Sequence, residues 1–313
     1  MPGPWDGPGD GSRAVALGGG HGLSRTLRAL TRVVDHVTAV VTVADDGGSS
    51  GRLRRDLGVI PPGDLRMAMA ALCPDDDLAT LLQYRFAAGE LDGHSLGNLI
   101  LVALQDLTGD VVDGLDEAMR LLDLRGRVLP CTTADVTLHA RAGGARIDGQ
   151  VSVASTPRVD EVWLEPSDVP PTPEALLAIR RADLLVLGPG SLFTSVLPNL
   201  LVPGVAAAVA ASRAPVVLVA NLREQPGETE GLDLPDHLAA LRSHVPDVHV
   251  THLVVHDGPD PSGPGRRLKA DPVALGEHVG EVLAADLLDG HDGHDPQALA
   301  AVLDRVLRPG VTV

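Results

Sequence analysis

The sequence predicts an α/β protein with a Rossmann-like, doubly wound and mostly parallel sheet that carries a helical and β-hairpin insertion. Near both ends of the chain, apolar β-branched runs alternate with segments of helical periodicity, as in a parallel sheet covered by helices on both faces. Between these regions, helical patterns follow one another and give way to a hairpin pattern. We therefore expect a tail at residues 1–12 and one domain at residues 13–313, with the insertion at about residues 63–165.

The first unit of the domain is a strand, a glycine-rich loop and a helix, followed by a second strand. These lie at residues 14–17, 18–24, 25–34 and 37–44, and a right-handed crossover makes the two strands parallel. In the insertion we expect helices at residues 63–73, 76–89, 94–107 and 113–123, and strands within residues 135–155 and 159–165. Gly143 and Gly144 suit the tight turn of a hairpin.

The alternation of helices and strands resumes after the insertion. We expect helices at residues 172–182, 191–201, 204–212, 234–244 and 295–307, and strands at residues 183–191, 214–222, 248–255 and 279–289. Residues 257–272 are rich in turn-forming residues and should be exposed. Ligands in open α/β sheets bind beyond the carboxyl ends of the strands, so the loops that follow these strands are the candidate site.

The composition of the 313 residues limits the partners. A formal net charge of −17 argues against nucleic acids and anionic membranes, which require basic faces. Lys269 is the only lysine, so a Walker-type phosphate loop and a pyridoxal Schiff base are excluded, and phosphate binding falls to backbone N–H groups, hydroxyls and arginines. Cys73 and Cys131 have no metal-ligand spacing, and we expect both to be buried. No apolar run reaches about 18 residues, which predicts a cytoplasmic protein.

The glycine-rich loop leads from the first strand into a helix, whose N-terminus carries about half a positive charge and suits an anion. Its spacing departs from the dinucleotide fingerprint, because Leu23 stands where the third glycine would fall. The loop residues expected to contact a ligand are Gly18, Gly19, Gly20, His21, Gly22, Leu23 and Ser24.

Asp45 and Asp46 follow the second strand and lead into Gly47, Gly48, Ser49 and Ser50. Two carboxylates beside a phosphate are unfavourable, because unit charges about 4 Å apart repel by about 4 kcal/mol, whereas an exposed helix end returns only about 0.3–1 kcal/mol. The acids therefore either accept hydrogen bonds from sugar hydroxyls or hold a Mg²⁺ ion. A third reading is an Asx-type turn with solvated acids.

Further candidates follow the later strands and open the insertion helices. Asp64 and Arg66 lie at a helix start, and Ser95 is an expected N-cap between His94 and Asn98. Gly188, Pro189, Gly190 and Ser191 form a turn that, with Thr194, is a second candidate anion site, and Asn221 and Arg223 end another strand. The histidines and acids of residues 291–296 look like a metal cluster, but helix capping by Asp295 with Pro296 explains them better and leaves their neighbours solvated. No nucleophile with a positioned base is evident.

Five segments together resemble the bacterial gluconeogenesis factor family, a relative of 2-phospho-L-lactate transferase: VTVADDGGSSGRLR, PPGDLR, HSLGNL, LGPGSLFTSVLPNLLV and QPGETEG. The resemblance implies a Rossmann-like fold, a cytoplasmic role in central carbon metabolism, cell-wall precursor supply and cell shape, and binding of a UDP-sugar, notably UDP-N-acetylglucosamine. It also implies ligand contacts for residues 18–24, 45–50, 64, 94–98 and 188–191, a homodimer, and a protein partner in amino-sugar metabolism. Two departures are His21, where the family usually has Thr, and Met67, where Asn is common.

Two other functions compete with a UDP-sugar-binding regulator. A Mg²⁺-dependent transferase of a phosphate-linked group would have to hold a flat deazaflavin, and a chain with only 2% aromatic residues has little to stack against one. A nicotinamide-dependent oxidoreductase is disfavoured by the incomplete fingerprint and by the acid pair beside its Gly/Ser loop.

Overall fold

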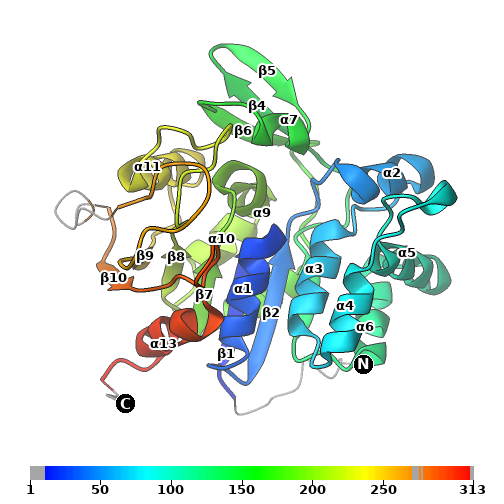
Figure 1. Ribbon diagram of the computed structural model, residues 1–313, viewed down its shortest axis with the longest axis horizontal. Helices are drawn as coiled ribbons and strands as arrows, with labels where there is room; N and C mark the ends of the chain where they lie inside the picture. The colour runs from blue at the N-terminus through cyan, green and yellow to red at the C-terminus, as the bar shows by residue number, and fades with distance from the viewer. Residues whose placement is uncertain (1–10, 270–274, 276–277, 311–313) are drawn as a thin grey trace.

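The structure, a computed structural model, describes residues 11–269, 275 and 278–310 (Figure 1). Residues 1–10 of the expected tail lie outside this range. Among the described residues, no helix combines the length and the apolar character needed to cross a bilayer.

One seven-stranded sheet forms the centre of the molecule, with the strand order β10-β9-β8-β7-β1-β2-β3, and every neighbouring pair is parallel. Its strands are β1 (Arg13–Gly18), β2 (His36–Val41), β3 (Arg127–Pro130), β7 (Leu184–Leu187), β8 (Val216–Val219), β9 (His252–His256) and β10 (Glu281–Ala285). All four residues of β7 and the last five of β1 are buried, as the apolar runs predicted for strands covered on both faces. The doubly wound sheet is confirmed.

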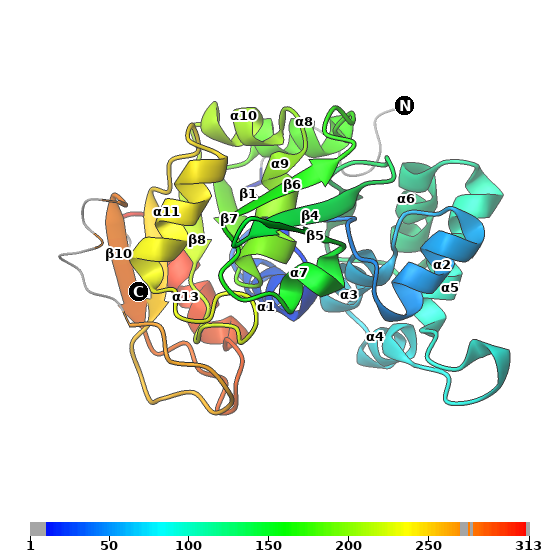
Figure 2. The ribbon, with the colours of Figure 1, turned by 90° about the horizontal axis from the view of Figure 1, so that it is seen from above.

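Helices cover both faces of the sheet (Figures 1 and 2). One layer contains α1 (Gly20–Leu30), α3 (Gly63–Leu72) and α13 (Pro296–Leu307), and the other contains α8 (Pro173–Arg181), α9 (Leu197–Leu201), α10 (Val205–Ala210) and α11 (Leu234–His244). The core between the layers is aliphatic, and Phe193 is the largest of its fully buried side chains.

The insertion begins with α3, α4 (Asp76–Gln83), α5 (Leu96–Thr108) and α6 (Val111–Leu121). A separate antiparallel sheet follows, with the order β5-β4-β6, and it projects beyond the carboxyl edge of the main sheet (Figure 1). Its elements are β4 (Thr137–Ala142), β5 (Ala145–Asp148), α7 (Gln150–Ala154) and β6 (Glu161–Glu165). Gly143 and Gly144 make the hairpin turn, as predicted.

Several elements differ from the sequence-based expectation. The Gly/Ser-rich segment after Asp46 is not a loop but the start of α2 (Gly48–Leu57), and the strand β3 was not predicted. Residues 150–154 were expected in a strand and form the helix α7. The helix expected to reach residue 89 ends at Gln83, and residues 192–196 form a single π-helical turn.

Cys131 is buried, as expected, and burial raises the pKa of its thiol to about 12. Cys73 is only half-buried, and the two thiols are free.

Both ends of the described chain lie at the amino edge of the sheet. The backbone N–H of Arg13 donates to Asp183 Oδ2 (2.8 Å) before β7, and Ser12 Oγ contacts Asp35 Oδ2 (3.1 Å) before β2. At the end of α13, Arg308 Nη2 donates to the carbonyl of Val33 (3.0 Å), which follows the last turn of α1. The loops of interest are at the opposite, carboxyl edge.

Candidate functional site

The strand order reverses between β1 and β7, because the chain builds outward in one direction from β1 and in the other from β7. Such a switch point leaves a crevice outside the carboxyl ends of the strands, where open α/β proteins bind ligands. The loops after β1, β2, β7 and β8 meet here, as the sequence predicted.

Three helices begin at this point without a side-chain cap: α1, α2 and α3 start at Gly20, Gly48 and Gly63. By contrast, α4, α5, α6, α11 and α13 each begin with an Asp or Ser that accepts from their first turn. Uncapped helix N-termini expose N–H groups and positive potential. Three of them together make a region suited to negative charge.

The glycines at these starts allow the backbones to approach closely. A Cβ atom on Gly19 would overlap the carboxylate of Asp64, and one on Gly63 would overlap Ser50 Oγ and lie 3.0 Å from Asp45 Oδ2. The positive φ of 63° at Gly20 adds a backbone requirement that favours glycine. The three helix starts thus converge on two acids, Asp45 and Asp64.

Asp64 is only 8% exposed, and burial together with the nearby charge of Asp45 raises its pKa to about 7. A hydrogen bond from the backbone of Gly20 and the charge of Arg66 act in the opposite direction but do not compensate. Asp45 itself accepts from the backbone N–H of Gly47 (3.0 Å), which is the Asx-type turn that the sequence allowed. The two carboxyl groups form an acid pair, in which the charge of Asp45 opposes the ionisation of Asp64.

Asp46, for which the sequence left a Mg²⁺ site, sugar hydroxyls and a solvated turn as alternatives, contacts another part of the protein. Its Oδ1 accepts from the backbone N–H of Val151 (3.0 Å), and a Cβ atom on Gly149 would overlap its Oδ2. Asp46 therefore ties the loop after β2 to α7 of the insertion. The acid that the fold brings to Asp45 is Asp64, 19 residues further along the chain rather than its neighbour.

The residues of the HSLGN motif form a buried network behind the three helix starts. Asn98 Nδ2 donates to Ser49 Oγ (3.0 Å), so the hydroxyl hydrogen of Ser49 is left for His94 Nδ1 (3.1 Å). Burial and the charge of Arg52 lower the pKa of His94, which favours the neutral ring that this arrangement needs.

Arg66 joins the same network by donating from Nη1 to Ser95 Oγ (2.8 Å), and Ser95 caps α5 as predicted. Burial and the charge of Arg85 lower the pKa of Arg66 to about 10. Arg66 Nε and Asn98 Oδ1 have no hydrogen-bond partner within the described part of the chain. These residues hold α2, α3 and α5 together. They do not line the groove beside α1.

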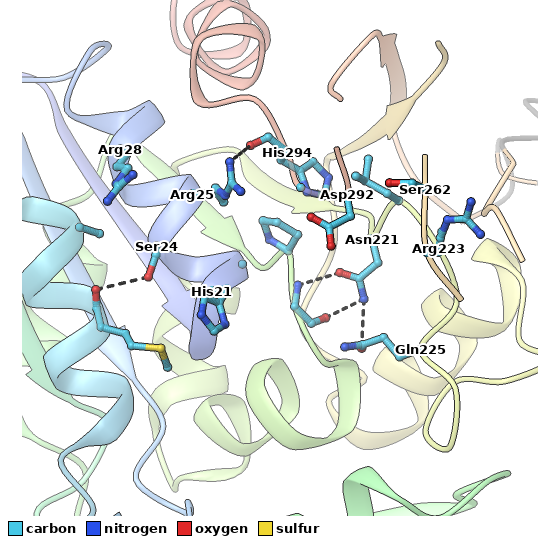
Figure 3. A pocket seen from close by; sticks show the side chains of 18 of the residues that line it. His21, Ser24, Arg25, Arg28, Asn221, Arg223, Gln225, Ser262, Asp292 and His294 are labelled. Carbon is cyan, nitrogen blue, oxygen red and sulfur yellow. Dashed lines mark hydrogen bonds between the residues drawn. The ribbon is translucent and has the colours of Figure 1, made fainter. Parts of the chain in front are cut away.

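A groove of about 1060 Å³ runs from the first turn of α1 along that helix (Figure 3). His21, Ser24, Arg25 and Arg28 lie along one face of α1 and line it, as their spacing of three, four and seven residues requires. The facing walls are formed by α3 and α4 and by three loops after β8, β9 and β10. Their lining residues include Met67, Ala70, Ala71, Thr80, Gln83, Asn221, Arg223, Gln225, Ser262, Asp292 and His294.

Two residues of the predicted glycine-rich loop, Gly22 and Leu23, pack against other parts of the protein. Leu23 is 1% exposed and packs in the core. A Cβ atom on Gly22 would overlap the carbonyl oxygen of Pro189, so the loops after β1 and β7 touch through their backbones. Ser24 Oγ is 3.2 Å from the carbonyl of Gly20 and 3.3 Å from that of Met67.

The second expected anion site, at the turn after β7, is filled by the protein's own Glu228. This carboxylate, 2% exposed, accepts from the backbone N–H groups of Phe193 (2.9 Å) and Thr194 (3.2 Å) and from the hydroxyl of Ser191. Burial raises its pKa. The expectation of a ligand anion at Ser191 and Thr194 is therefore corrected, since a side chain of the QPGETEG motif takes that position.

Asn221 braces the same turn. Its Oδ1 accepts from the backbone N–H of Gly190 (2.8 Å), and its Nδ2 donates to the carbonyl of Gly190 (2.9 Å) and to Gln225 Oε1 (3.3 Å). Asn221 lines the groove, as predicted, although its side chain is largely engaged within the protein.

The turn before α13 closes the groove. Asp295 accepts from the N–H groups of Gln297 and Ala298, and Pro296 opens the helix, as predicted. No group of three or more metal-ligating side chains occurs among the described residues. His294 was expected to be solvated, yet it is 5% exposed. Arg25 holds this turn through Asp289 Oδ2 (2.7 Å) and the carbonyl of His294 (3.3 Å).

Sequence reasoning missed Arg25, Arg28, Glu228 and His294 as members of this region. The helical spacing of Arg25 and Arg28 after His21 was an available signal. Glu228 and His294 reach this region through long-range contacts, which leave no signal in the local sequence beyond the motifs that contain them.

Comparisons with known proteins agree on one family. Residues 14–279 match the family described as 2-phospho-L-lactate transferase CofD. The chain is 48% identical over 308 residues to the putative gluconeogenesis factor of Mycobacterium tuberculosis strain H37Rv, covering 93% of this chain and 89% of that protein. It is 46% identical over 237 residues to the gluconeogenesis factor of Bacillus subtilis strain 168, covering 74% and 75%. A UPF0052 family member from Bacillus halodurans superposes with a TM-score of 0.89 at 37% identity, covering 95% and 99%.

Proposed function

The chain belongs to the CofD family and, within it, is related to the gluconeogenesis factors; from this premise we propose that it binds a nucleotide-sugar of the UDP-N-acetylglucosamine type. In this proposal the bound ligand makes the protein a cytoplasmic regulator of central carbon metabolism and cell-wall precursor supply. A homodimer and a protein partner in amino-sugar metabolism belong to the same proposal.

The observation that carries the proposal is the convergence of three uncapped helix N-termini on Asp45 and Asp64, beside a groove of about 1060 Å³. The N–H groups suit a diphosphate, because helix starts bind phosphate through backbone donors and the helix dipole. The groove shares His21 and Gly22 with this region, so a ligand anchored there by its phosphates has space to extend along α1.

Mg²⁺ fits this arrangement, because it is usually held by one or two carboxylates together with substrate phosphates. Asp45 and Asp64 would hold the ion, since burial and the charge of Asp45 raise the pKa of Asp64 and a cation would offset both effects. When bound, the ion supplies neutralisation of the diphosphate charge. The protein's own residues then orient the ligand through the helix N–H groups.

The family match keeps a phosphate-linked group transfer as the second candidate. The Ser49–His94 contact is the one hydroxyl–imidazole pair near the acids, and both residues are buried, at 3% and 8% exposed. Neither lines the groove. A binding function therefore explains the described side chains with fewer requirements than a transferase.

Isothermal calorimetry with UDP-N-acetylglucosamine, UDP-glucose, GDP and NAD, each with and without Mg²⁺, tests the proposal. We expect UDP-N-acetylglucosamine to bind most tightly, and Mg²⁺ to strengthen its binding. Asp45→Asn and Asp64→Asn should remove the effect of Mg²⁺, whereas the exposed Asp168→Asn should leave both affinity and Mg²⁺ effect unchanged.

Three outcomes would change the conclusion. Tighter binding of NAD than of every UDP-sugar would favour an oxidoreductase. Loss of the Mg²⁺ effect in Asp46→Asn instead of Asp64→Asn would return the metal to the adjacent acids. Turnover of a guanylylated donor with a deazaflavin acceptor would establish the transferase.

A further inference from the structure

His294 presents a hydrogen-bond acceptor to the groove. Its Nε2 lies 3.0 Å from the carbonyl oxygen of Ala220, and because a carbonyl only accepts, Nε2 must carry the ring hydrogen. In a neutral ring Nδ1 is then a bare lone pair. Burial lowers the pKa of this side chain to about 4, which keeps the ring neutral at physiological pH.

The acceptor is open to the groove. Among the described residues Nδ1 has no hydrogen-bond partner, and it is not one of the buried polar atoms left without one, so solvent reaches it. His294 and Asp292, from the loop after β10, and Asn221, from the loop after β8, lie across the groove from His21 (Figure 3). Arg25 holds the backbone of His294, and the contact of Nε2 with the carbonyl of Ala220 fixes the orientation of the ring.

Two hydrogen-bond donors lie in the same groove wall. Gln225 uses its Oε1 to accept from Asn221, and its Nε2 has no partner in the described part of the chain. Arg223 Nη1 donates to the carbonyl of Gly265, and its Nη2 is without a partner within those same residues. The wall therefore offers a fixed acceptor at His294, with two further donors elsewhere along it.

A fixed acceptor is the complement of the N3–H donor of uracil. We propose that His294 Nδ1 accepts the hydrogen bond from the N3–H group of the ligand's uracil and so selects uracil over cytosine. The inference rests on the proposed nucleotide-sugar function and assigns its base specificity to one residue. Cytosine would place its own N3 lone pair against that of His294.

Discrimination of this kind is large, because a mismatched buried polar group costs the full desolvation of both partners. We expect UDP to bind about 10- to 100-fold more tightly than CDP. A ligand that keeps both uracil carbonyls but lacks the N3 hydrogen, N3-methyl-UDP, should lose a similar factor.

The test is calorimetry of the wild-type protein with UDP, CDP and N3-methyl-UDP, which needs no variant. His294→Phe, which keeps a ring but neither nitrogen, should bring the ratio of UDP to CDP affinity toward one. His294→Gln retains one donor for Ala220 and one acceptor for the base, so it should keep part of the preference. His291→Gln, exposed in the same turn, is the matched control and should behave as wild type.

Equal binding of CDP or N3-methyl-UDP to the wild-type protein would overturn the inference while leaving UDP-sugar binding intact. A folded His294→Phe variant that retains the full preference would do the same. If none of the nucleotides nor UDP-N-acetylglucosamine binds, the proposed function fails and this inference fails with it.

Discussion

At the scale of single residues, the acids of the site show how much depends on partners distant in sequence. Adjacent Asp45 and Asp46 could be predicted as a functional pair, but neighbours along an extended backbone point in different directions. The side chain of Asp46 accepts a hydrogen bond from the backbone of Val151, and the acid beside Asp45 is Asp64. The sequence identified all three acids, whereas which two share a site is decided by the packing of α3 against α1.

Asp64→Asn should stabilise the ligand-free protein. The amide has the shape of the carboxyl group but no charge to repel Asp45, and the raised pKa of Asp64 shows that its charged form is disfavoured. We expect the free energy of unfolding in urea, at pH 7.5 with a chelator, to rise by about 1–3 kcal/mol. The exposed Asp168→Asn is the control, and a destabilised Asp64→Asn variant would contradict the repulsion inferred here.

His294 should make stability fall in weak acid. Its pKa in the folded state is lowered to about 4 from the ordinary 6.5, so between these values the unfolded chain binds more protons than the native one. The contribution of neutral His294 to the free energy of unfolding is complete above pH 6.5, and it declines by up to about 3 kcal/mol as the pH falls to 4. Urea unfolding at pH 7 and pH 4.5 should show a smaller decline for His294→Gln than for wild type.

The exposed His291→Gln serves as the control for this measurement, since its side chain lies in the same turn. An equal decline in His294→Gln and wild type would mean that His294 titrates normally in the folded protein.

At the scale of elements, the glycines at the helix starts explain both the successes and the errors of the sequence-based prediction. Gly-Ser-Ser-Gly has low intrinsic helix propensity, so the start of α2 was interpreted as a loop. Its helical state depends on contacts with α3 and α5, such as Asn98 with Ser49. Strand β3 has four residues and ends in Pro130, and its pairing with β2 carries no local signal. The long apolar runs of β1, β2, β7 and β8 needed no such context.

The element α7 shows the reverse conflict. Residues 150–154 alternate β-branched and small residues in a way typical of a strand, yet they form one helical stretch whose first turn includes the bond from Val153 N–H to the carbonyl of Gly149 (3.0 Å). The backbone of Val151 is engaged by Asp46 at the same time. The contact between Asp46 and Val151 thus joins the loop after β2 to the segment that forms a helix instead of the expected strand.

Gly22→Ala should destabilise the packing of α1 against the turn after β7. The added methyl group would overlap the carbonyl oxygen of Pro189, which is backbone and has little freedom to move. We expect a loss of about 1–3 kcal/mol in thermal or urea unfolding. Gly18→Ala, in the same loop, places its methyl group 3.6 Å from Leu23 Cβ and should change stability by less than about 0.5 kcal/mol. Equal effects of the two substitutions would argue against the tight contact.

At the scale of the whole molecule, the position of the candidate site follows from the doubly wound sheet that the sequence predicted. Alternating strands and helices at both ends imply a doubly wound sheet, and the loops at its carboxyl edge meet at the switch point. The opposite wall of the groove could not be predicted, because it combines α4 with turns from three distant parts of the chain. Contacts such as that between Glu228 and the start of the π-helical turn join segments 34 to 37 residues apart.

Ligand and Mg²⁺ should stabilise the molecule together more than separately. Without the ion, the diphosphate is repelled by the two acids. Without the diphosphate, the ion has only part of its ligands. In a thermal-shift experiment, we expect the rise in Tm with UDP-N-acetylglucosamine plus Mg²⁺ to exceed the sum of the two separate rises. Asp64→Asn should make the effects additive, and additivity in the wild-type protein would contradict a shared site.

The location of both described chain ends at the amino edge of the sheet has a practical consequence. Gly11 and Gly310, the first and last residues of the continuous ends described, lie by the starts of the strands, whereas the groove opens beyond their carboxyl ends. A biotin anchor or fluorescent fusion attached through either end would hold the molecule with its groove turned toward the bulk solution. Surface-based binding assays and optical reporters can therefore use both ends interchangeably, and comparing the two orientations gives an internal check for steric hindrance.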